Sequence, residues 1–331
     1  MPPPKGKIME YILKATGDLT DRSAEIEKLL EEYKACVLTP GTYYVSGVKM
    51  PDDTCLMGMG AGTVIVLDEK VEDGYTVLMG SRCTVKDLML TGTLEDMDRP
   101  TEVGNRHGFG FIGNAVTTQS TPQPRDSIIT GCHITNFSGG GITCRDTGYG
   151  INSSLSVTNC RIHNCGAGIN IAHFSEYHNF TNVTSTRNLY GCINNGGNNV
   201  FVGCGFDGNT VGYLIDNSQK QSNNNAHGTC TACTFNHTNH NAGVGIRILG
   251  SKPGYVFTGC QMFFSDIEVE DSTGIQFANF NFGKAVGIRI KGEGVVRFTD
   301  CIFSSQPVFA LTEAPNVTIS GCQTKKAETV Q

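Results

Sequence analysis

Short stretches in which apolar and polar residues alternate recur along most of the chain. The clearest share the pattern apolar-x-x-Cys-x-apolar, as in Ile129–Ile134 and Val157–Ile162. Looser copies are centred on five further cysteines, with a valine and a phenylalanine in the cysteine position of two more: Cys204, Cys233, Cys260, Cys301, Cys322, Val183 and Phe280. Successive anchor positions lie 20 to 29 residues apart. Such a period predicts stacked structural units.

A second short stretch that opens with glycine follows the anchor in most repeats. These glycines are Gly141, Gly168, Gly191, Gly212, Gly245 and Gly287. Alternation with a period of two predicts strands that are buried on one face. A unit of two or three short strands without a helix cannot bury its apolar face alone, so it must stack on its neighbours. The pattern therefore predicts an all-β chain folded as a parallel β-helix.

The beginning of the chain contains three segments in a characteristic order, Gly17–Ile26, Leu38–Val45 and Pro51–Gly60. Over about residues 17–65 the sequence resembles the pectin-lyase-like superfamily of right-handed parallel β-helices, in particular its pectate-lyase-3-type members. The resemblance implies a right-handed coil and relatives among glycoside hydrolases, transglycosylases, polysaccharide lyases and phage tailspikes. It also implies that three copies associate side by side as a homotrimer.

One amphipathic helix is expected before the first strand. Thr20 or Asp21 is placed to cap it, and an apolar stripe runs along it through Ile26, Leu29, Leu30 and Tyr33. Such a helix would cover the strand edges at one end of the solenoid. The expected organisation is an N-terminal segment with a capping helix (1–35), one parallel β-helix (36–322) and a polar tail (323–331).

Composition excludes several classes of partner and location. The longest apolar runs, such as Val64–Leu67, are far too short to span a membrane, and the net charge of −6 argues against nucleic acid as a partner. No signal-peptide pattern is visible at the N-terminus. Localisation stays unknown, but 14 cysteines, half of them at the expected core anchor, fit cytoplasmic production or a phage particle.

No metal or cofactor is expected. Cys230 and Cys233 form a CxxC with His227 just upstream, but no second pair exists and alternation sends residues three apart to opposite strand faces. Calcium, which pectate lyases often use, would need clustered aspartates. The adjacent Asp52 and Asp53 lie in an early coil, away from the candidate row described next.

Uneven spacing of the repeats predicts long loops that emerge on a shared face of the solenoid. Aligned on the glycine, the second strands carry Arg145, Ala172, Asn195 and Asp216 at one position and Asp146, His173, Gly196 and Asn217 at the next. With one coil per ~4.8 Å this row spans about 14 Å, the length of two to three sugar rings. Polar side chains with aromatic neighbours on such a row predict a carbohydrate site.

Three carboxylates are candidates for catalysis: Asp216, Glu176 and Asp146. Most glycoside hydrolases cleave the glycosidic bond with a pair of catalytic carboxyl groups. Asp216 follows a buried strand and suits a nucleophile or base; Glu176, beside Tyr177, suits a general acid. Substrate-binding roles are expected for six residues: Arg145, His173, Tyr177, Asn195, Asn217 and His227. A lyase would instead use Arg145, His173 or His227 as cation or base.

Three functions remain open at this point. The first is a carbohydrate-active enzyme, a glycoside hydrolase, transglycosylase or polysaccharide lyase, that cleaves or rearranges a polysaccharide. The second is a phage or prophage tail protein that binds a cell-surface glycan, with or without cleavage. The third is a non-catalytic structural solenoid, in which Asp216 and Glu176 only cap turns through backbone N–H groups.

Overall fold

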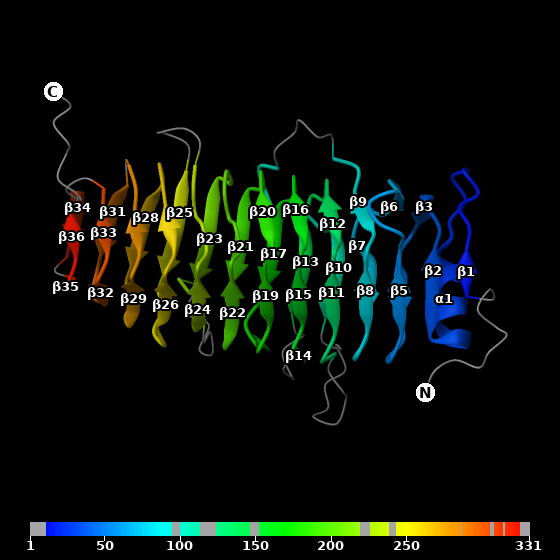
Figure 1. The fold of residues 1–331 in the computed structure, drawn as a ribbon, viewed down its shortest axis with the longest axis horizontal. Coiled ribbons are helices and arrows are strands. Elements are labelled where there is room, and N and C mark those ends of the chain that lie inside the picture. The colour runs from blue at the N-terminus through cyan, green and yellow to red at the C-terminus, as the bar shows by residue number, and fades with distance from the viewer. Residues whose placement is uncertain are drawn as a thin grey trace.

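The computed structural model describes residues 11–94, 100–112, 124–145, 152–218, 226–237, 243–284, 286–304, 308–313 and 315–324. Its strands form a long stack of coils, with the chain running from one end of the stack to the other (Figure 1). Every strand pair in the described residues is parallel and joins one coil to the next. The predicted all-β parallel β-helix is therefore confirmed.

Each coil contributes strands to three sheets, which we name A, B and C. Sheet A contains β1 (Ile12–Leu13), β2 (Ala35–Leu38), β5 (Cys55–Met57), β8 (Thr84–Lys86), β11 (Ile128–Thr130), β15 (Ser156–Thr158), β19 (Asn179–Thr181), β22 (Asn199–Val202), β24 (Gly228–Thr231), β26 (Tyr255–Thr258), β29 (Ile275–Ala278), β32 (Val295–Thr299) and β35 (Asn316–Ser320).

Sheet B is interrupted. It contains β3 (Gly41–Val45), β6 (Thr63–Leu67), β9 (Met89–Thr91), β12 (His133–Thr135), β16 (Arg161–His163) and β20 (Thr184–Thr186), and resumes with β27 (Gln261–Met262), β30 (Asn281–Phe282), β33 (Ile302–Phe303) and β36 (Gln323–Thr324). Single bridges through Gly205 and Thr234 connect the two parts.

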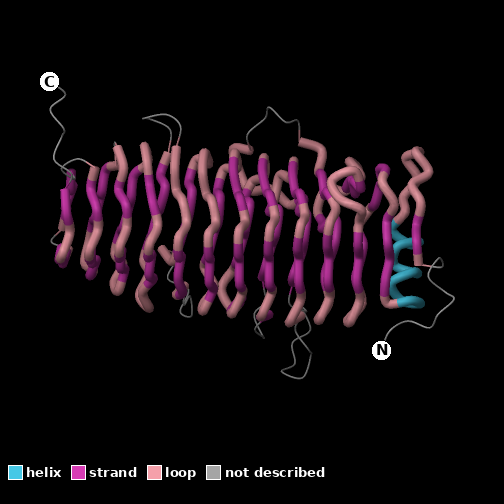
Figure 2. The backbone as a smooth tube through the Cα atoms, in the orientation of Figure 1, coloured by secondary structure: helices cyan, strands magenta, loops and turns pink. Residues whose placement is uncertain are grey.

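Sheet C contains β4 (Val48–Met50), β7 (Gly74–Met79), β10 (Arg106–Ile112), β13 (Gly140–Arg145), β17 (Ala167–Ile171), β21 (Tyr190–Asn194), β23 (Val211–Asp216), β25 (Val244–Leu249), β28 (Asp266–Glu270), β31 (Gly287–Lys291) and β34 (Val308–Thr312). A short pair outside the three sheets joins β14 (Asn152–Ser153) to β18 (Ser175–Glu176). Figure 2 shows strands alternating with loops along the whole stack.

The helix α1 (Ser23–Tyr33) lies beside β2 at the N-terminal end of the stack (Figure 1). Its Ile26 and Leu30 are buried in the core. The N-cap is Arg22, one residue later than expected; the Asp21 carboxylate accepts hydrogen bonds from the Ser23 N–H (2.9 Å) and hydroxyl (2.6 Å). Strands lie on both sides of the predicted 36–322 range, because β1 precedes the helix and β36 follows residue 322.

The repeat anchors form one buried ladder at the turn from sheet A to sheet B. Exposed fractions of the predicted members are 0–2%: Cys132, Cys160, Cys204, Cys233 and Cys260. The expected burial of the anchor cysteines is therefore confirmed. Hydrogen bonds keep the anchors in register, because the backbone N–H just after each anchor donates to the anchor carbonyl of the preceding coil, as from Arg161 to Cys132 (3.0 Å). All 14 cysteines are free thiols.

A second ladder consists of five of the six predicted glycines of sheet C, extended by Gly108 in β10: Gly141, Gly168, Gly191, Gly212 and Gly245. The sixth, Gly287 in β31, lies opposite Asp266 instead of a glycine. A Cβ atom on Gly191 would lie 2.4 Å from the Gly212 carbonyl oxygen, and one on Gly212 would lie 2.5 Å from that of Gly245. The glycines are therefore required by the close approach of neighbouring coils. Where β25 pairs with β28, the register shifts between Val244 and Ile246, and the ladder ends.

Candidate functional site

The chain passes from sheet C to sheet A along one edge of the stack, which we call the loop edge. Connections on this edge follow β10, β13, β17, β21 and β23, so the expected shared face is present in part. The expected loops around Leu94 and Asn236 leave the turn from sheet B to sheet C instead. Among the described residues no helix is long and apolar enough to cross a bilayer. The predicted site residues that the structure describes lie on this loop edge, at the ends of the sheet C strands and in the connections that follow them.

The predicted row is in register. The Ala172 N–H donates to the Cys144 carbonyl (2.9 Å), and the Asn195 N–H donates to the Ile171 carbonyl (2.8 Å). Asn195 Oδ1 then accepts a hydrogen bond from the Asp216 N–H (2.9 Å). Arg145 ends β13 at the same level, but its side chain and all of Asp146 lie outside the described residues.

Asp216 is the last residue of β23 and is half-buried. Its Oδ1 accepts hydrogen bonds from the Ser218 N–H (2.9 Å) and hydroxyl (2.6 Å), so the carboxylate caps the turn that leaves the sheet. Asn217 is held by the next coil, since its N–H donates to the Leu249 carbonyl (2.8 Å) and its Nδ2 to the Gly250 carbonyl (3.2 Å). The turn is fixed, which orients Asp216 along the loop edge.

Glu176 and Tyr177 lie in the loop after β17. Glu176 belongs to β18, opposite Ser153 of β14, and its Oε2 accepts a hydrogen bond from Asn198 Nδ2 (3.3 Å). Tyr177 is 53% exposed and has φ of 60°, a left-handed conformation that is uncommon for a bulky residue. Phe174, whose ring meets that of His173 edge-on at 5.6 Å, has φ of 61°. Such strained aromatic positions cluster at binding sites.

Tyr177 belongs to a corner ladder, a series of left-handed residues at the same turn of successive coils. Its members are Asp53, Arg82, Asp126, Ser154, Tyr177 and Asn198. In register with Asn198 is His227, because the residues that follow them, Asn199 and Gly228, are paired. Glu176, Tyr177, Asn198 and His227 therefore lie on three consecutive coils.

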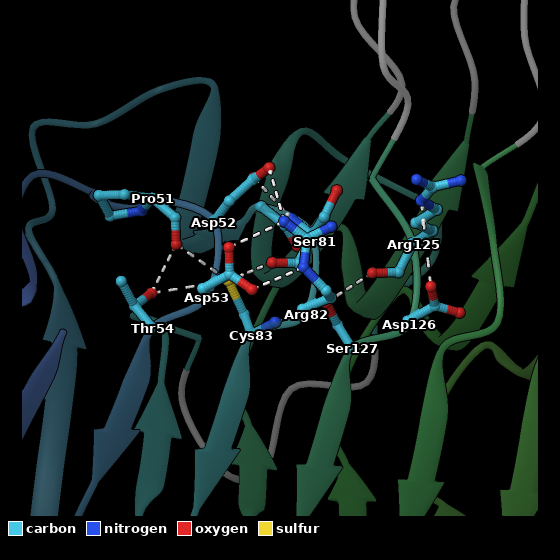
Figure 3. A network of polar contacts seen from close by, with 11 residues as sticks. Pro51, Asp52, Asp53, Thr54, Ser81, Arg82, Cys83, Arg125, Asp126 and Ser127 are labelled. Carbon is cyan, nitrogen blue, oxygen red and sulfur yellow. Dashed lines mark hydrogen bonds and ion pairs between the residues drawn. The ribbon is translucent and has the colours of Figure 1, made fainter. Parts of the chain in front are cut away.

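The first three members of the corner ladder are charged (Figure 3). Arg82 forms a two-point ion pair with Asp53 (2.6 and 2.8 Å), which lowers the pKa of that carboxyl, and approaches Asp52 at 3.6 Å. Arg125 lies 3.9 Å from Asp126 on the next coil. Sequence reasoning noted only the two aspartates. Their partner Arg82 lies 29 residues from Asp53 and becomes its neighbour only through coil stacking.

Beneath the loop edge lies a buried hydrogen-bond network. Asn194 Nδ2 donates to the hydroxyls of Tyr213 (2.9 Å) and Tyr255 (3.3 Å), which lie 2.6 Å apart. Asn199 Nδ2 donates to Asn194 Oδ1 (3.0 Å). Asn199 Oδ1 accepts from the His178 N–H (2.9 Å), two residues after Glu176. The network therefore ties the Glu176 loop to the core, and the sequence analysis did not find it.

His178 is also fully buried. Its Nδ1 accepts a hydrogen bond from the Leu155 N–H (3.1 Å), and burial lowers its pKa to about 3, so the imidazole is neutral in the folded protein. In the described part of the chain, no group of three or more His, Cys, Asp or Glu side chains is arranged to hold a metal ion.

The catalytic candidates are not all brought together. Asp216 contacts Asn195, while Glu176 contacts Asn198 on the same intervening coil. Two coil steps separate the backbones of Asp216 and Glu176, about 9.6 Å along the axis. The two residues also lie at different places across the loop edge: Asp216 at the end of β23, and Glu176 next to the corner ladder.

Comparison with known proteins gives the fold. No protein-family model and no curated protein sequence matches the chain. Among solved structures, the A-module of the Azotobacter vinelandii mannuronan C-5 epimerase AlgE4 is similar with a TM-score of 0.60 and 14% identity, over 95% of this chain and 96% of that one. The chain has the pectin-lyase-like parallel β-helix fold.

Two further structures share this fold. The tailspike gp49 of Acinetobacter baumannii bacteriophage Fri1, a capsular polysaccharide depolymerase, gives a TM-score of 0.56 with 13% identity over 96% of this chain. The chain spans 64% of that tailspike. The GH87 α-1,3-glucanase of Streptomyces thermodiastaticus gives 0.57 with 12% identity, covering 99% of this chain and 71% of that one. All three similar proteins act on polysaccharides.

Proposed function

We propose that this protein is a carbohydrate-active enzyme that binds a polysaccharide along the loop edge and cleaves it. One observation carries the proposal: the exposed, strained Tyr177 lies beside Glu176 on a polar corner ladder. An exposed aromatic face next to hydrogen-bonding side chains suits a sugar ring. The polysaccharide-acting proteins of the same fold support the class of substrate.

The mechanism we favour is hydrolysis with inversion. Glu176 donates a proton to the glycosidic oxygen, while Asp216 removes a proton from the attacking water on the opposite face of the sugar. Inverting enzymes hold the two carboxyl groups about 6.5–9.5 Å apart, and retaining enzymes about 5–5.5 Å. Two coil steps, about 9.6 Å along the axis, separate their backbones, which is nearer to the longer separation than to the shorter one.

Other candidate residues would hold the sugar. Asn195 lies on the Asp216 row, and His173 and Asn217 lie one position after it. Tyr177 and His227 lie at the corner ladder. Arg145 completes the row toward the N-terminus.

We also infer a right-handed coil, a capping role for α1 and a homotrimer whose protomers pack side by side. A monomer mass that does not change with concentration would contradict the trimer.

The test is a polysaccharide screen with matched variants. Asp216→Asn and Glu176→Gln should each abolish turnover while the free energy of unfolding changes by less than about 1 kcal/mol. Glu270→Gln is the control, because Glu270 lies on the same outward row as Asp216, two coils later, and should keep full activity. Activity retained by both site variants would contradict the assignment, and Asp146 with Asp216 would be the next pair.

The screen also separates the alternatives. New reducing ends without ultraviolet absorbance indicate hydrolysis, whereas an absorbing unsaturated product indicates a lyase with Arg145, His173 or His227 in its site. Glycan binding without either product favours a tail protein that recognises a surface glycan. Absence of binding to every glycan favours a structural solenoid.

A further inference from the structure

Cys301 and Cys322 are the last two thiols of the buried ladder and lie directly opposite each other. Thr299 pairs with Ser320 before them, and Ile302 pairs with Gln323 after them, so the register is unbroken. The Cys301 N–H donates a hydrogen bond to Cys322 Sγ (3.4 Å). The two sulfurs therefore belong to one contact between neighbouring coils.

Coil spacing brings this pair within range of a disulfide. Residues in register on neighbouring strands lie about 4.8 Å apart, and disulfides join Cα atoms about 4.4–6.8 Å apart. The Cβ atoms of a disulfide lie closer, about 3.5–4.5 Å. Bond formation therefore requires the two coils to approach slightly, and the cost depends on how freely one of them can move.

Side chains in the last described coil are less buried than their partners in the coil before it. Leu311 is 48% exposed and Ile319 is 50% exposed, although their partners one coil earlier, Ile290 and Phe298, are buried. Cys322 is half-buried, and Cys301 is fully buried. Interior pairs such as Cys132 and Cys160 are fully buried and held by coils on both sides.

We propose that Cys301 and Cys322 form a redox-sensitive pair that closes into a disulfide with a disulfide oxidant, such as oxidised glutathione, and fastens the last coil to the stack. The bond closes a loop of 21 residues. Closing such a loop restrains the chain when the coil opens, and so opposes fraying of β34, β35 and β36.

The reaction balances in two exchange steps. The accessible Cys322 thiolate attacks one sulfur of oxidised glutathione, forms a mixed disulfide and releases one glutathione thiolate. Cys301 then loses its proton to solvent and its sulfur attacks Cys322 Sγ, which releases the second glutathione. Two electrons pass from the protein to the oxidant. Burial raises the pKa of the Cys301 thiol to about 12, which makes the second step the slow one.

The test uses the full chain incubated with oxidised or reduced glutathione under native conditions. After free thiols are blocked, peptide mass mapping should find Cys301 joined to Cys322, with Cys132 and Cys160 still free. Hydrogen exchange of amides in β35 should slow about tenfold or more on oxidation and recover with reductant. The Cys301→Ser variant should lose this slowing.

Cys55 is the internal control. It is also half-buried, but its in-register neighbours are Ala35 and Thr84, so it should stop at the mixed disulfide. Two results would overturn the proposal. One is Cys322 left as a mixed disulfide with Cys301 free. The other is cross-linking of the interior pairs to the same extent, which would show that the reaction follows global unfolding.

Discussion

Two parts of the stack use the same coil but treat the outer surface of sheet C differently. From β10 to β25 the strands contain the glycine ladder and lead into the polar loop edge. From β28 onward the glycine ladder is broken, since Gly287 of β31 lies opposite Asp266, and charged residues alternate with buried ones. Arg247 pairs with Glu268 (2.6 Å), and Arg289 pairs with both Glu268 (3.2 Å) and Asp266 (2.6 Å).

The interiors differ in the same places. Under the loop edge, Asn194, Asn199 and His178 share a buried hydrogen-bond network with two tyrosines. A stack of phenylalanines begins beneath the same edge with Phe180 and Phe201 (4.8 Å) and continues through the later coils, where Phe277 lies between Phe257 (5.2 Å) and Phe298 (5.1 Å). Departures from the simple repeat thus coincide with the candidate site, while the regular coils serve as scaffold.

Removing an aromatic ring from the regular part should have the largest effect. Phe277→Ala leaves a cavity inside the phenylalanine stack and should lower the free energy of unfolding by about 4 kcal/mol. Phe309→Ala is the control, because Phe309 lies in the last coil and is only half-buried. Denaturant unfolding measures both. An equal loss of unfolding free energy in both variants would contradict the view that phenylalanine packing contributes more to stability in the interior coils than in the last coil.

Breaking the buried network should cost somewhat less. Asn199→Ala leaves the His178 N–H and Asn194 Oδ1 without this partner, so we expect a loss of about 3 kcal/mol in the free energy of unfolding. Asn179→Ala, on an exposed strand position, should change it by less than about 0.5 kcal/mol. A small effect for Asn199→Ala would show that the network contributes little to stability.

The glycine ladder should tolerate no side chain. Gly191→Ala places a Cβ 2.4 Å from the Gly212 carbonyl oxygen and should destabilise the protein by about 2 kcal/mol. The matched variant Gly62→Ala meets nothing closer than a Pro40 side-chain carbon at 3.9 Å and should be nearly neutral. Thermal unfolding of the two variants compares them directly, and a neutral Gly191→Ala would mean that the coils separate easily.

The loop-edge region should also be the acid-sensitive one. The pKa of His178 is lowered to about 3 in the folded protein, whereas an unfolded histidine has a pKa near ~6.5. Between these pH values His178 is protonated in the unfolded state and neutral in the folded state, so the free energy of unfolding falls as the pH drops from ~6.5 toward 3. The slope is at most about 1.4 kcal/mol per pH unit.

Unfolding measured between about pH 6.5 and 5, above the carboxylate range, contains this contribution together with that of His133, whose pKa is also lowered by burial. His178→Gln should flatten the slope in that window whatever its overall stability. Asn179→Gln, at an exposed position without a titratable side chain, should leave the slope unchanged. An unaltered slope in His178→Gln would show that another group causes the acid loss.

Much of the fold was readable from the chain because it depends on local repetition. The cysteine anchors, the glycines of sheet C and the helix stripe all concern which face of a short segment is buried. Each coil repeats the same alternation of buried and exposed residues, so one pattern predicts many strands. The candidate row from Ala172 to Asp216 was likewise predictable, because aligned strands place equivalent residues on neighbouring coils.

Tertiary structure alone decided which distant side chains meet. The ion pair of Asp53 with Arg82 and the network from Asn194 to Tyr255 depend on turn conformation and on how far each loop reaches. Loops vary in length, so no period relates their residues. The sequence by itself determined the coil, the buried ladders and the edge that carries the loops. Stacking determined the neighbours on that edge, because contacts between coils join residues 20 or more positions apart.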